Sequence, residues 1–351
     1  MSPDPSDTLL AAQRRSAELE ARIAEDPARF RILTGDRPTG PLHLGHYFGT
    51  VAGRVRLQRL GVELFVLVAD YQALTDRDVA ENLPEHVDGL VADYLAVGID
   101  PGKATIFTHS AVPALNQLLL PFLSLVSVAE LARNPTVKEE IEASRRAVSG
   151  LMFTYPVHQA ADILFCKANL VPVGKDQLPH LELTRTVSRR FNDRYGPVFP
   201  VPDALLSPVP HLLGLDGQKM SKSRGNAIPL SLPSDEVARR IRGARTDAQR
   251  RITYEPDTRP EVANLVRLVA LCQDRDPVEV ADEVGDAGAA ALKRLAIDAV
   301  EGFLAPIRAA RAAYLDDRAQ LRRILRAGNE RACAIAEDTL REVRAAMATD
   351  Y

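Results

Sequence analysis

The stretch RILTGDRPTGPLHLGH, residues 31–46, decides the fold because it joins a strand, a turn and a helix. Arg31 to Leu33 reads as a short strand, and a turn rich in glycine and proline, TGDRPTGP, follows it. From Leu44 to Val55 apolar residues recur at helical spacing, which predicts a helix with one apolar face. The segment therefore reads as the first strand–turn–helix unit of an α/β domain.

The segments that follow repeat this alternation. LFVLV, residues 64–68, is a continuous apolar run of strand length, typical of a strand buried on both faces. A helical stripe over 83–94 and a strand over 104–107 come next, and LVPV, residues 170–173, predicts a further strand before a helix over 176–192. Strands and helices in this order predict a doubly wound parallel sheet, whose ligands bind at the carboxyl ends of the strands.

The late part of the chain is almost wholly helical, which predicts an all-α domain after the α/β domain. We expect an N-terminal helical extension over 1–29, an α/β domain over 30–226 with a helical insertion at about 113–150, and a helical domain over 227–351. Gly328-Asn329 reads as the end of one helix and the cap of the next.

Composition excludes several classes of protein. The chain has 351 residues, 46% of them hydrophobic, a net charge of −3, and three cysteines that show no metal-binding spacing. Neither a signal peptide nor a run long enough to span a bilayer is evident, so we expect a cytoplasmic protein with no membrane segment and no protein-bound metal. With this net charge, a nucleic-acid partner would have to meet a local basic patch.

The first candidate site is His43-Leu44-Gly45-His46, at the start of the first predicted helix. Backbone N–H groups at a helix N-terminus favour anions, so two histidines flanking a glycine could approach a phosphate there. Taken alone, a motif this short is more often a helix N-terminus with two surface histidines.

A second candidate site is the loop Lys219-Met220-Ser221-Lys222-Ser223, bracketed by glycine and aspartate. Two lysines three residues apart suit a polyphosphate whose charge grows as a phosphate bond breaks. A short basic run on its own is usually a solvated loop.

The third candidate lies in TYPVHQAADIL, residues 154–164. Tyr155, Gln159 and Asp162 share one face of the predicted helix, and Asp162 stands among apolar residues. A carboxylate in apolar surroundings needs a donor, which a ligand N–H or ammonium could supply. A nearby backbone group or arginine is an equally good explanation.

These segments together resemble one enzyme family. H-x-G-H after a first strand with KMSKS late in the α/β region resembles class I aminoacyl-tRNA synthetases. TGDRPTGPLHLGH, AADILFCKANLVPVGKDQLPHLELTRTVSRRFNDRYG and KMSKS resemble the tryptophanyl-tRNA synthetase branch, from about residue 31 to the C-terminus. The resemblance implies a Rossmann-like catalytic domain and a C-terminal domain that reads the tRNA anticodon. It further implies L-tryptophan, ATP with Mg²⁺ and tRNA(Trp) as the molecules handled, and a homodimer.

The resemblance also assigns roles to residues of this sequence. It implies catalysis by His43, His46, Lys219 and Lys222, with the lysines and Ser221 holding pyrophosphate. The ATP site would comprise Arg37, Pro38, Thr39, Gly45, His46, Gly174, Lys175, Asp176, Leu212, Lys219, Met220, Ser221, Lys222 and Ser223. Tryptophan would be bound by Asp162, Gln159, Tyr155, Gln72 and Gly35, with Asp162 accepting the indole N–H.

The chain departs from the family pattern at Arg37, Gln159 and Lys175, where many members carry Gln, Met and an acid. It therefore resembles a divergent, second type of the bacterial enzyme. A tyrosyl-tRNA synthetase and a non-catalytic paralogue that acts through a partner are the alternatives.

Basic side chains gather directly after the KMSKS loop. Six arginines fall between Arg239 and Arg251, and they could bind the tRNA acceptor arm. A solvated helix face paired with Asp235, Glu236 and Asp247 explains the same run equally well.

Overall fold

The sheet at the centre of the molecule is parallel and has five strands. The computed structural model describes residues 5–74, 82–135, 137–138, 148–174, 177–206, 212–221 and 224–351, with side chains described from residue 13 onward. The strand order is β3-β2-β1-β4-β5, which confirms the doubly wound parallel sheet. The strands are β1 Arg31–Asp36, β2 Glu63–Val68, β3 Ala104–Thr108, β4 Leu170–Val173 and β5 Asp203–Leu206.

Two strands differ from the prediction. β1 runs on to Asp36, because Thr34, Gly35 and Asp36 pair with Val66, Leu67 and Val68 of β2, so the turn begins only at Arg37. β5 lies in the proline-rich stretch 197–210, where the sequence analysis predicted no strand. It is a short edge strand that pairs with β4, and edge positions tolerate flanking prolines.

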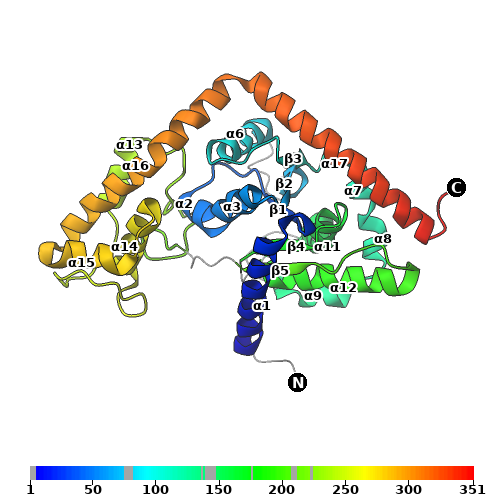
Figure 1. Ribbon diagram of the computed structural model, residues 1–351, viewed down its shortest axis with the longest axis horizontal. Helices are drawn as coiled ribbons and strands as arrows, with labels where there is room; N and C mark the ends of the chain where they lie inside the picture. The colour runs from blue at the N-terminus through cyan, green and yellow to red at the C-terminus, as the bar shows by residue number, and fades with distance from the viewer. Residues whose placement is uncertain are drawn as a thin grey trace.

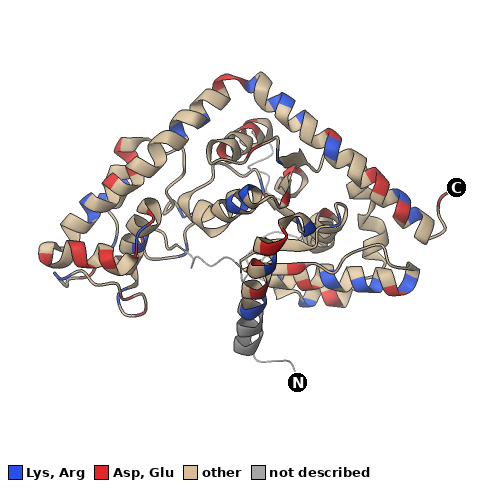
Figure 2. Cartoon of the chain, viewed as in Figure 1, with Lys and Arg blue, Asp and Glu red and all other residues tan. Residues whose placement is uncertain are grey.

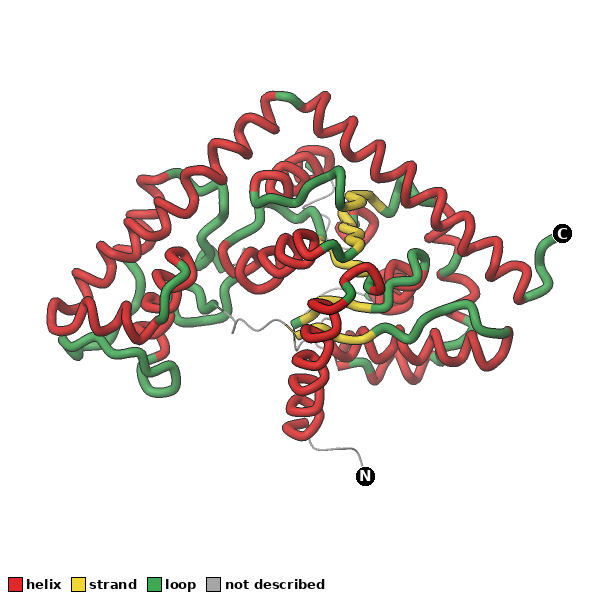
Figure 3. The backbone as a smooth tube through the Cα atoms, viewed as in Figure 1, coloured by secondary structure: helices red, strands yellow, loops and turns green. Residues whose placement is uncertain are grey.

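Helices cover both faces of the sheet (Figures 1 and 3). Alternate strand residues face opposite sides, so Ile32, Leu64 and Val66 join one core cluster, whereas Leu33 and Phe65 join the other. Among the described residues, no helix is both long and apolar enough to cross a membrane. The helices of this part are α1 Pro5–Glu25, η1 Pro27–Arg29, α2 Leu44–His46, the π-helical turn η2 Tyr47–Val51, α3 Ala52–Leu60, α4 Asp70–Ala73, α6 Leu83–Ala96, α7 Pro113–Gln117, α8 Leu119–Leu123, α9 Val128–Arg133, α11 Gly150–Leu164 and α12 Leu178–Tyr195.

The C-terminal part is helical, as predicted, but its last break was misplaced. The chain turns at Asp317, where two long helices meet over α6 (Figure 1). Gly328 and Asn329 lie inside the second of these helices and form no break. The elements are α13 Ser234–Arg242, α14 Pro260–Gln273, α15 Pro277–Val284, η4 Gly285–Ala287, α16 Gly288–Asp316 and α17 Arg318–Ala346.

The position of Gly328 has a packing reason. A Cβ at this residue would lie 1.8 Å from the carbonyl oxygen of Ile106 in β3, so only glycine lets α17 approach the strand this closely. The neighbouring Asn329 accepts a hydrogen bond from the Thr108 amide at 3.0 Å, and Arg331 donates to the Ala104 carbonyl. Helix α17 therefore covers the β3 edge of the sheet and occupies its backbone groups.

The opposite edge is covered in the same way. Ser16 of α1 accepts a hydrogen bond from the Leu206 amide at 3.0 Å and lies against the Ala204 carbonyl of β5. Arg15 of the same helix pairs with Asp203 at 2.8 Å. The N-terminal and C-terminal helices thus each cover one edge strand.

Candidate active site

The H-x-G-H segment forms a closed turn at the mouth of α2. The amide of His46 donates to Nδ1 of His43 and the amide of His43 donates to Nδ1 of His46, each at 3.3 Å. The two rings stack with their centroids 3.6 Å apart. Because each Nδ1 accepts a hydrogen bond, the proton of each neutral ring is on Nε2. The turn therefore presents two Nε2–H donors at a helix N-terminus, an arrangement suited to an anion.

The KMSKS loop packs directly on this turn. A Cβ at Gly45 would lie 3.0 Å from the His43 ring and 3.1 Å from the sulfur of Met220. The chain beyond the loop pairs with the turn as a short antiparallel ribbon: the Leu44 amide donates to the Ile228 carbonyl at 3.0 Å, and the Leu230 amide to the Leu42 carbonyl at 2.8 Å. Two motifs about 175 residues apart in sequence are thus one structural unit.

Asn226 organises the loop from within. Its side-chain carbonyl accepts a hydrogen bond from the Ser221 amide at 2.8 Å, and its amide donates to Asp216 at 2.8 Å and to the Lys219 carbonyl at 3.1 Å. Gly214 makes room for it, since a Cβ there would lie 2.2 Å from the Asn226 amide nitrogen. Lys219 and Ser221 are held by this side chain, and the Lys219 side chain is exposed.

The base of the loop is anchored on the helical lobe α13–α16. Asn264 of α14 accepts from the Leu213 amide at 2.9 Å and donates to its carbonyl at 3.1 Å. Further along, Asp247 receives two hydrogen bonds from the buried guanidinium of Arg259, at 2.7 and 2.8 Å. This pairing, chiefly through those hydrogen bonds, lowers the pKa of Asp247.

The end of β1 carries a buried charge network. Asp36 accepts hydrogen bonds from Arg54 of α3 and Tyr94 of α6, both at 2.6 Å. Burial alone would raise the pKa of Asp36, but the Arg54 charge and hydrogen bond, with smaller contributions from His46 and Tyr94, outweigh it and lower the pKa well below its usual range. Asp36 therefore stays ionised beside the turn that carries His46.

The other ATP-site candidates lie around the carboxyl ends of β1 and β4. Arg37 is exposed, Pro38 is buried, and the Thr39 amide closes a turn on the Arg37 carbonyl at 2.8 Å. Gly174 follows β4, and Leu212 is buried beside the base of the KMSKS loop. The strand order reverses between β1 and β4, which is where a doubly wound sheet binds ligands. Lys175, Asp176, Lys222 and Ser223 lie outside the described residues.

Asp162 lies in a buried polar cluster. Its Oδ1 is 2.9 Å from Nε2 of His109, and its Oδ2 accepts from the Gln72 amide at 3.3 Å. The carboxylate is 2% exposed. The His109 ring and the Gln72 amide therefore hold Asp162, rather than a backbone group or an arginine. A carboxylate has about four lone-pair sites, so it can still accept a further hydrogen bond.

A second histidine stands behind this cluster. Asn116 donates through its amide to the carbonyls of His109 and Val112, so its Oδ1 accepts from Nε2 of His158 at 2.8 Å. Burial, with a smaller opposing effect from Asp162, lowers the pKa of His158, so this ring is neutral. His109, His158 and Asp162 are close enough to hold a metal ion, but both Nε2 atoms already donate to protein oxygens, which disfavours one.

The remaining tryptophan-site candidates lie further out. Tyr155 and Gln159 are on α11 with Asp162, as predicted, and both are half-buried. The Tyr155 hydroxyl is 3.1 Å from Nε2 of His180 on α12. Gly35 is exposed in β1, and a Cβ there would lie 2.5 Å from the Leu67 carbonyl oxygen. Glycine at position 35 therefore permits the close approach of β1 to Leu67 of β2.

Comparison with known proteins identifies the family. The model of the family described as "tRNA synthetases class I (W and Y)" matches residues 25–305 of this chain. The chain is 44% identical over 335 residues to the tryptophan–tRNA ligase of Treponema pallidum, covering 90% of this chain and 96% of that protein. It is 41% identical over 340 residues to the Streptococcus pyogenes tryptophan–tRNA ligase, covering 91% and 98%.

The chain belongs to the class I tRNA synthetases of the tryptophan and tyrosine group.

A solved structure of this synthetase family supports the assignment. Tryptophanyl-tRNA synthetase from Campylobacter jejuni, complexed with ADP and tryptophan, superimposes with a TM-score of 0.79 at 28% identity, over 91% of this chain and 99% of that one. The fold of the synthetase family is therefore present over nearly the whole chain.

Several residues of the candidate site escaped the sequence analysis. Asp70 and His109 each stand just past the end of a strand, and that placement could have singled them out. Asp70 accepts hydrogen bonds from the amides of Tyr71 and Ser110 and lies 3.8 Å from Nδ1 of His109. No sequence pattern predicts the ion pair between Asp36 and Arg54. The two residues are 18 positions apart and meet only because the fold brings α3 next to the end of β1.

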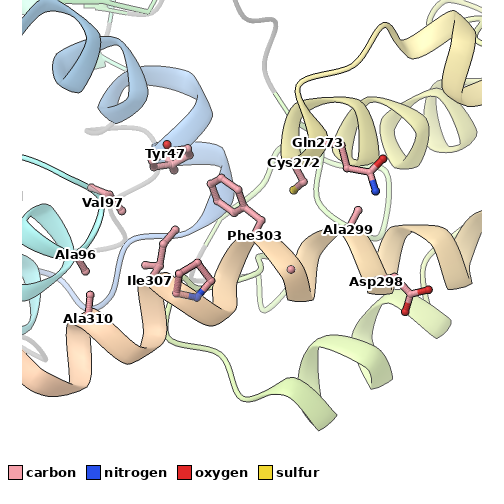
Figure 4. A pocket seen from close by; sticks show the side chains of 12 residues that line it. Tyr47, Ala96, Val97, Cys272, Gln273, Asp298, Ala299, Phe303, Ile307 and Ala310 are labelled. Atoms are coloured by element: carbon pink, nitrogen blue, oxygen red, sulfur yellow. The ribbon is translucent and has the colours of Figure 1, made fainter. Parts of the chain in front are cut away.

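A cavity lies beside the synthetase site, between the α/β domain and the helical lobe (Figure 4). It has a volume of about 720 Å³, and Tyr47, next to His46, lines it together with Cys272 of α14 and Phe303 of α16. Burial raises the pKa of the Cys272 thiol to about 12, so the thiol is not ionised at neutral pH. Tyr47 and Phe303 also pack against each other at this cavity, with their ring centroids 5.1 Å apart.

Proposed function

We propose that this protein is a tryptophan–tRNA ligase. It activates L-tryptophan with ATP, releasing pyrophosphate, and transfers the tryptophan to tRNA(Trp). The observation that carries the proposal is the packing of Met220 on Gly45, which brings the KMSKS loop onto the H-x-G-H turn at the carboxyl end of β1. The tryptophan–tRNA ligases of similar sequence support it.

Activation follows from this arrangement without a general base. The carboxylate of tryptophan is ionised at neutral pH, so its oxygen can attack the α-phosphorus while the bond to the β-phosphate oxygen breaks. The Nε2–H groups of His43 and His46 stabilise charge on the α-phosphate, and Lys219 and Lys222 stabilise charge on the leaving pyrophosphate. Catalysis is then positioning and charge stabilisation.

Mg²⁺ would enter with the nucleotide. In the part of the chain that the structure describes, the one group suited to holding a metal is His109, His158 and Asp162, and the Nε2 atom of each histidine already faces a protein oxygen. Mg²⁺ prefers phosphate oxygens and water to such a site. The residues present therefore fit a Mg²⁺ ion that is carried by ATP. The ion would neutralise charge on the phosphates, and the protein would hold the phosphates themselves.

Selection of tryptophan rests on Asp162. We propose that its carboxylate accepts the indole N–H while Gln72 and His109 hold it in place. Gln159, Tyr155 and Gly35 complete the pocket. A buried acceptor of this kind rejects side chains that lack a matching donor, because the carboxylate would be left under-satisfied.

Binding of tRNA is assigned to the helical C-terminal domain, with residues 227–351 reading the anticodon, and to the arginine run that follows KMSKS. The arginine run is partly paired: Arg239 and Arg240 contact Glu236, and Arg251 lies 3.6 Å from Asp286. Figure 2 shows that basic and acidic residues are interspersed along the C-terminal helices. Arg242 is exposed at the end of α13 and is the best candidate for a phosphate contact. We further propose a homodimer that works in the cytoplasm.

The deciding experiment is ATP–pyrophosphate exchange with tryptophan or tyrosine. We expect exchange with tryptophan alone, and its loss in Asp162→Ala. Asp88→Asn, which alters a buried carboxylate outside the pocket, is the matched control and should keep exchange. Exchange with tyrosine alone would preserve the chemistry but replace the substrate. Absence of exchange with both amino acids would favour a non-catalytic paralogue.

A separate assay tests the tRNA contact. Arg242→Ala should raise the KM for tRNA in aminoacylation and leave pyrophosphate exchange unchanged, since Arg242 lies outside the ATP site. Arg239→Ala is the control, because Arg239 is held by Glu236 at 2.7 Å. Equal effects of the two variants would argue against a specific contact at Arg242.

A further inference from the structure

Asp93 on α6 joins two parts of the protein that are far apart in sequence. It is completely buried, its Oδ2 accepts from the Leu42 amide at 2.8 Å, and its Oδ1 accepts from Nε of Arg311 on α16 at 2.5 Å. Leu42 directly precedes His43. A buried carboxylate is stable only with such donors, so the contact ties α16 to the start of the H-x-G-H turn.

The same helix also reaches the other strand of this small ribbon. Arg308, one turn before Arg311, donates to the Leu232 carbonyl at 3.1 Å and is held by Glu301 at 2.6 Å. Leu232 follows Leu230, whose amide donates to the Leu42 carbonyl. Arg308 therefore contacts the segment beyond KMSKS directly, and Arg311 reaches the segment before the H-x-G-H turn through Asp93, near the place where these two segments pair.

The Arg311 contact is built into the packing of α6. The guanidinium lies over Gly89, where a Cβ would come within 3.3 Å of it. Nearby, Phe303 of α16 packs against Tyr47 and Phe48, with ring centroids 5.1 and 5.2 Å apart, while Gly302, Pro306 and Ile307 line the cavity of Figure 4. The polar contact through Asp93 therefore adds a directional link to the apolar packing between α16 and the α/β domain.

We propose that Arg311 and Asp93 are positioning residues for the ATP site. Through the Leu42 amide they set the place of His43 and His46, so the orientation of the helical lobe controls nucleotide activation. Since the helical lobe is where tRNA is proposed to bind, this contact links tRNA binding to the adenylation site. The inference rests on the proposed function.

The test uses the full-length enzyme and tryptophan-dependent pyrophosphate exchange. Arg311→Gln removes the charge and shortens the side chain, and we expect a rise in the KM for ATP or a fall in kcat of on the order of 10- to 100-fold. The KM for tryptophan should stay within about twofold, because Asp162 is not part of this network. Arg311→Lys, which keeps a charged donor, should recover part of the loss.

A matched control shares helix α6 with this pair. Asp88 of α6 pairs with Arg322 of α17 at 2.9 Å, outside the connection from Arg311 through Asp93 to Leu42. Asp88→Asn with Arg322→Gln should lower thermal stability without changing the KM for ATP. If Arg311→Gln fails to fold, the double variant Asp93→Asn/Arg311→Gln replaces it. The amide introduced at position 93 can still accept from the Leu42 amide and can pair with the amide introduced at position 311.

An activity-independent measurement separates this inference from the proposed function. Hydrogen exchange of the peptide that contains the Leu42 and Leu44 amides should be faster in Arg311→Gln and unchanged in the Asp88/Arg322 control. Unaltered hydrogen exchange at these amides in Arg311→Gln, or an equal loss of ATP affinity in the Asp88/Arg322 control, would overturn the positioning role of Arg311 and Asp93. If the wild-type enzyme showed no pyrophosphate exchange, the proposed function would be wrong. The hydrogen-exchange result would then decide the positioning role by itself.

Discussion

Nε2 of His109 lies 2.9 Å from Oδ1 of Asp162, and both side chains are buried. The histidine follows β3 and the aspartate stands on α11, so the contact joins a strand end to a helix 53 residues later in the chain. Because Gln72 donates to the other oxygen, the carboxylate is held on both sides. The orientation of the proposed tryptophan acceptor is thus set by two side chains, one at each carboxylate oxygen.

Removal of the His109 donor should weaken tryptophan binding specifically. A hydrogen bond to a charged group contributes about 1.5–3 kcal/mol, so His109→Ala should raise the KM for tryptophan roughly 10- to 100-fold while the KM for ATP stays near its original value. His109→Gln keeps an N–H donor and should lose less. Steady-state pyrophosphate exchange at varied tryptophan and ATP gives both constants. Equal increases in the two constants would contradict a local role for His109.

Asn226 should be essential for ATP activation but not for tryptophan binding. Asn226→Ala removes the hydrogen bonds to Ser221, Asp216 and Lys219, so the KMSKS loop loses its fixed shape. We expect kcat for exchange to fall about 10- to 100-fold. Asn192→Ala is the matched control, since Asn192 organises the Val198–Phe199 turn in the same way, away from this site. A similar fall in the control would show that the effect is general.

Gly328→Ala should destabilise the protein by forcing α17 away from β3. The new methyl group would overlap the Ile106 carbonyl oxygen, and overpacking of this kind costs at least about 1–3 kcal/mol. Gly302→Ala on α16 meets no atom within 4 Å and should instead stabilise the protein by about 0.5–1 kcal/mol. Denaturant unfolding of both variants measures the contrast. Equal stability of the two variants would contradict the close approach of α17 to β3.

Asp36 should contribute to stability against acid. Its pKa is lowered in the folded protein, so its contribution is complete above the ordinary value of 3.8 and is lost as the pH falls below it. Asp36→Asn leaves Arg54 buried without its counter-charge and should cost roughly 3 kcal/mol at pH 7. The unfolding free energy of the Asp36→Asn variant should also fall less steeply between pH 5 and pH 3 than that of the parent protein. Unfolding curves over this range check the prediction, and parallel pH profiles would contradict it.

Local sequence patterns predicted the parallel sheet well and its details less well. The spacing of apolar residues located β2, β3 and β4 to within one residue, because buried parallel strands are continuous apolar runs. β5 escaped because four residues at a sheet edge between prolines leave no such run. Gly328 and Asn329 were misread because a glycine required by close packing looks the same in sequence as a glycine that ends a helix.

The sequence by itself determined the doubly wound fold and the presence of the H-x-G-H and KMSKS segments, since periodicity and short motifs depend only on neighbouring residues. Tertiary structure alone decided that Met220 packs on Gly45, that His109 holds Asp162, and that Arg311 reaches Leu42 through Asp93. Each of these contacts joins residues at least 50 positions apart. Their geometry depends on how α6, α11 and α16 pack around the sheet, and no local pattern in the chain encodes that packing.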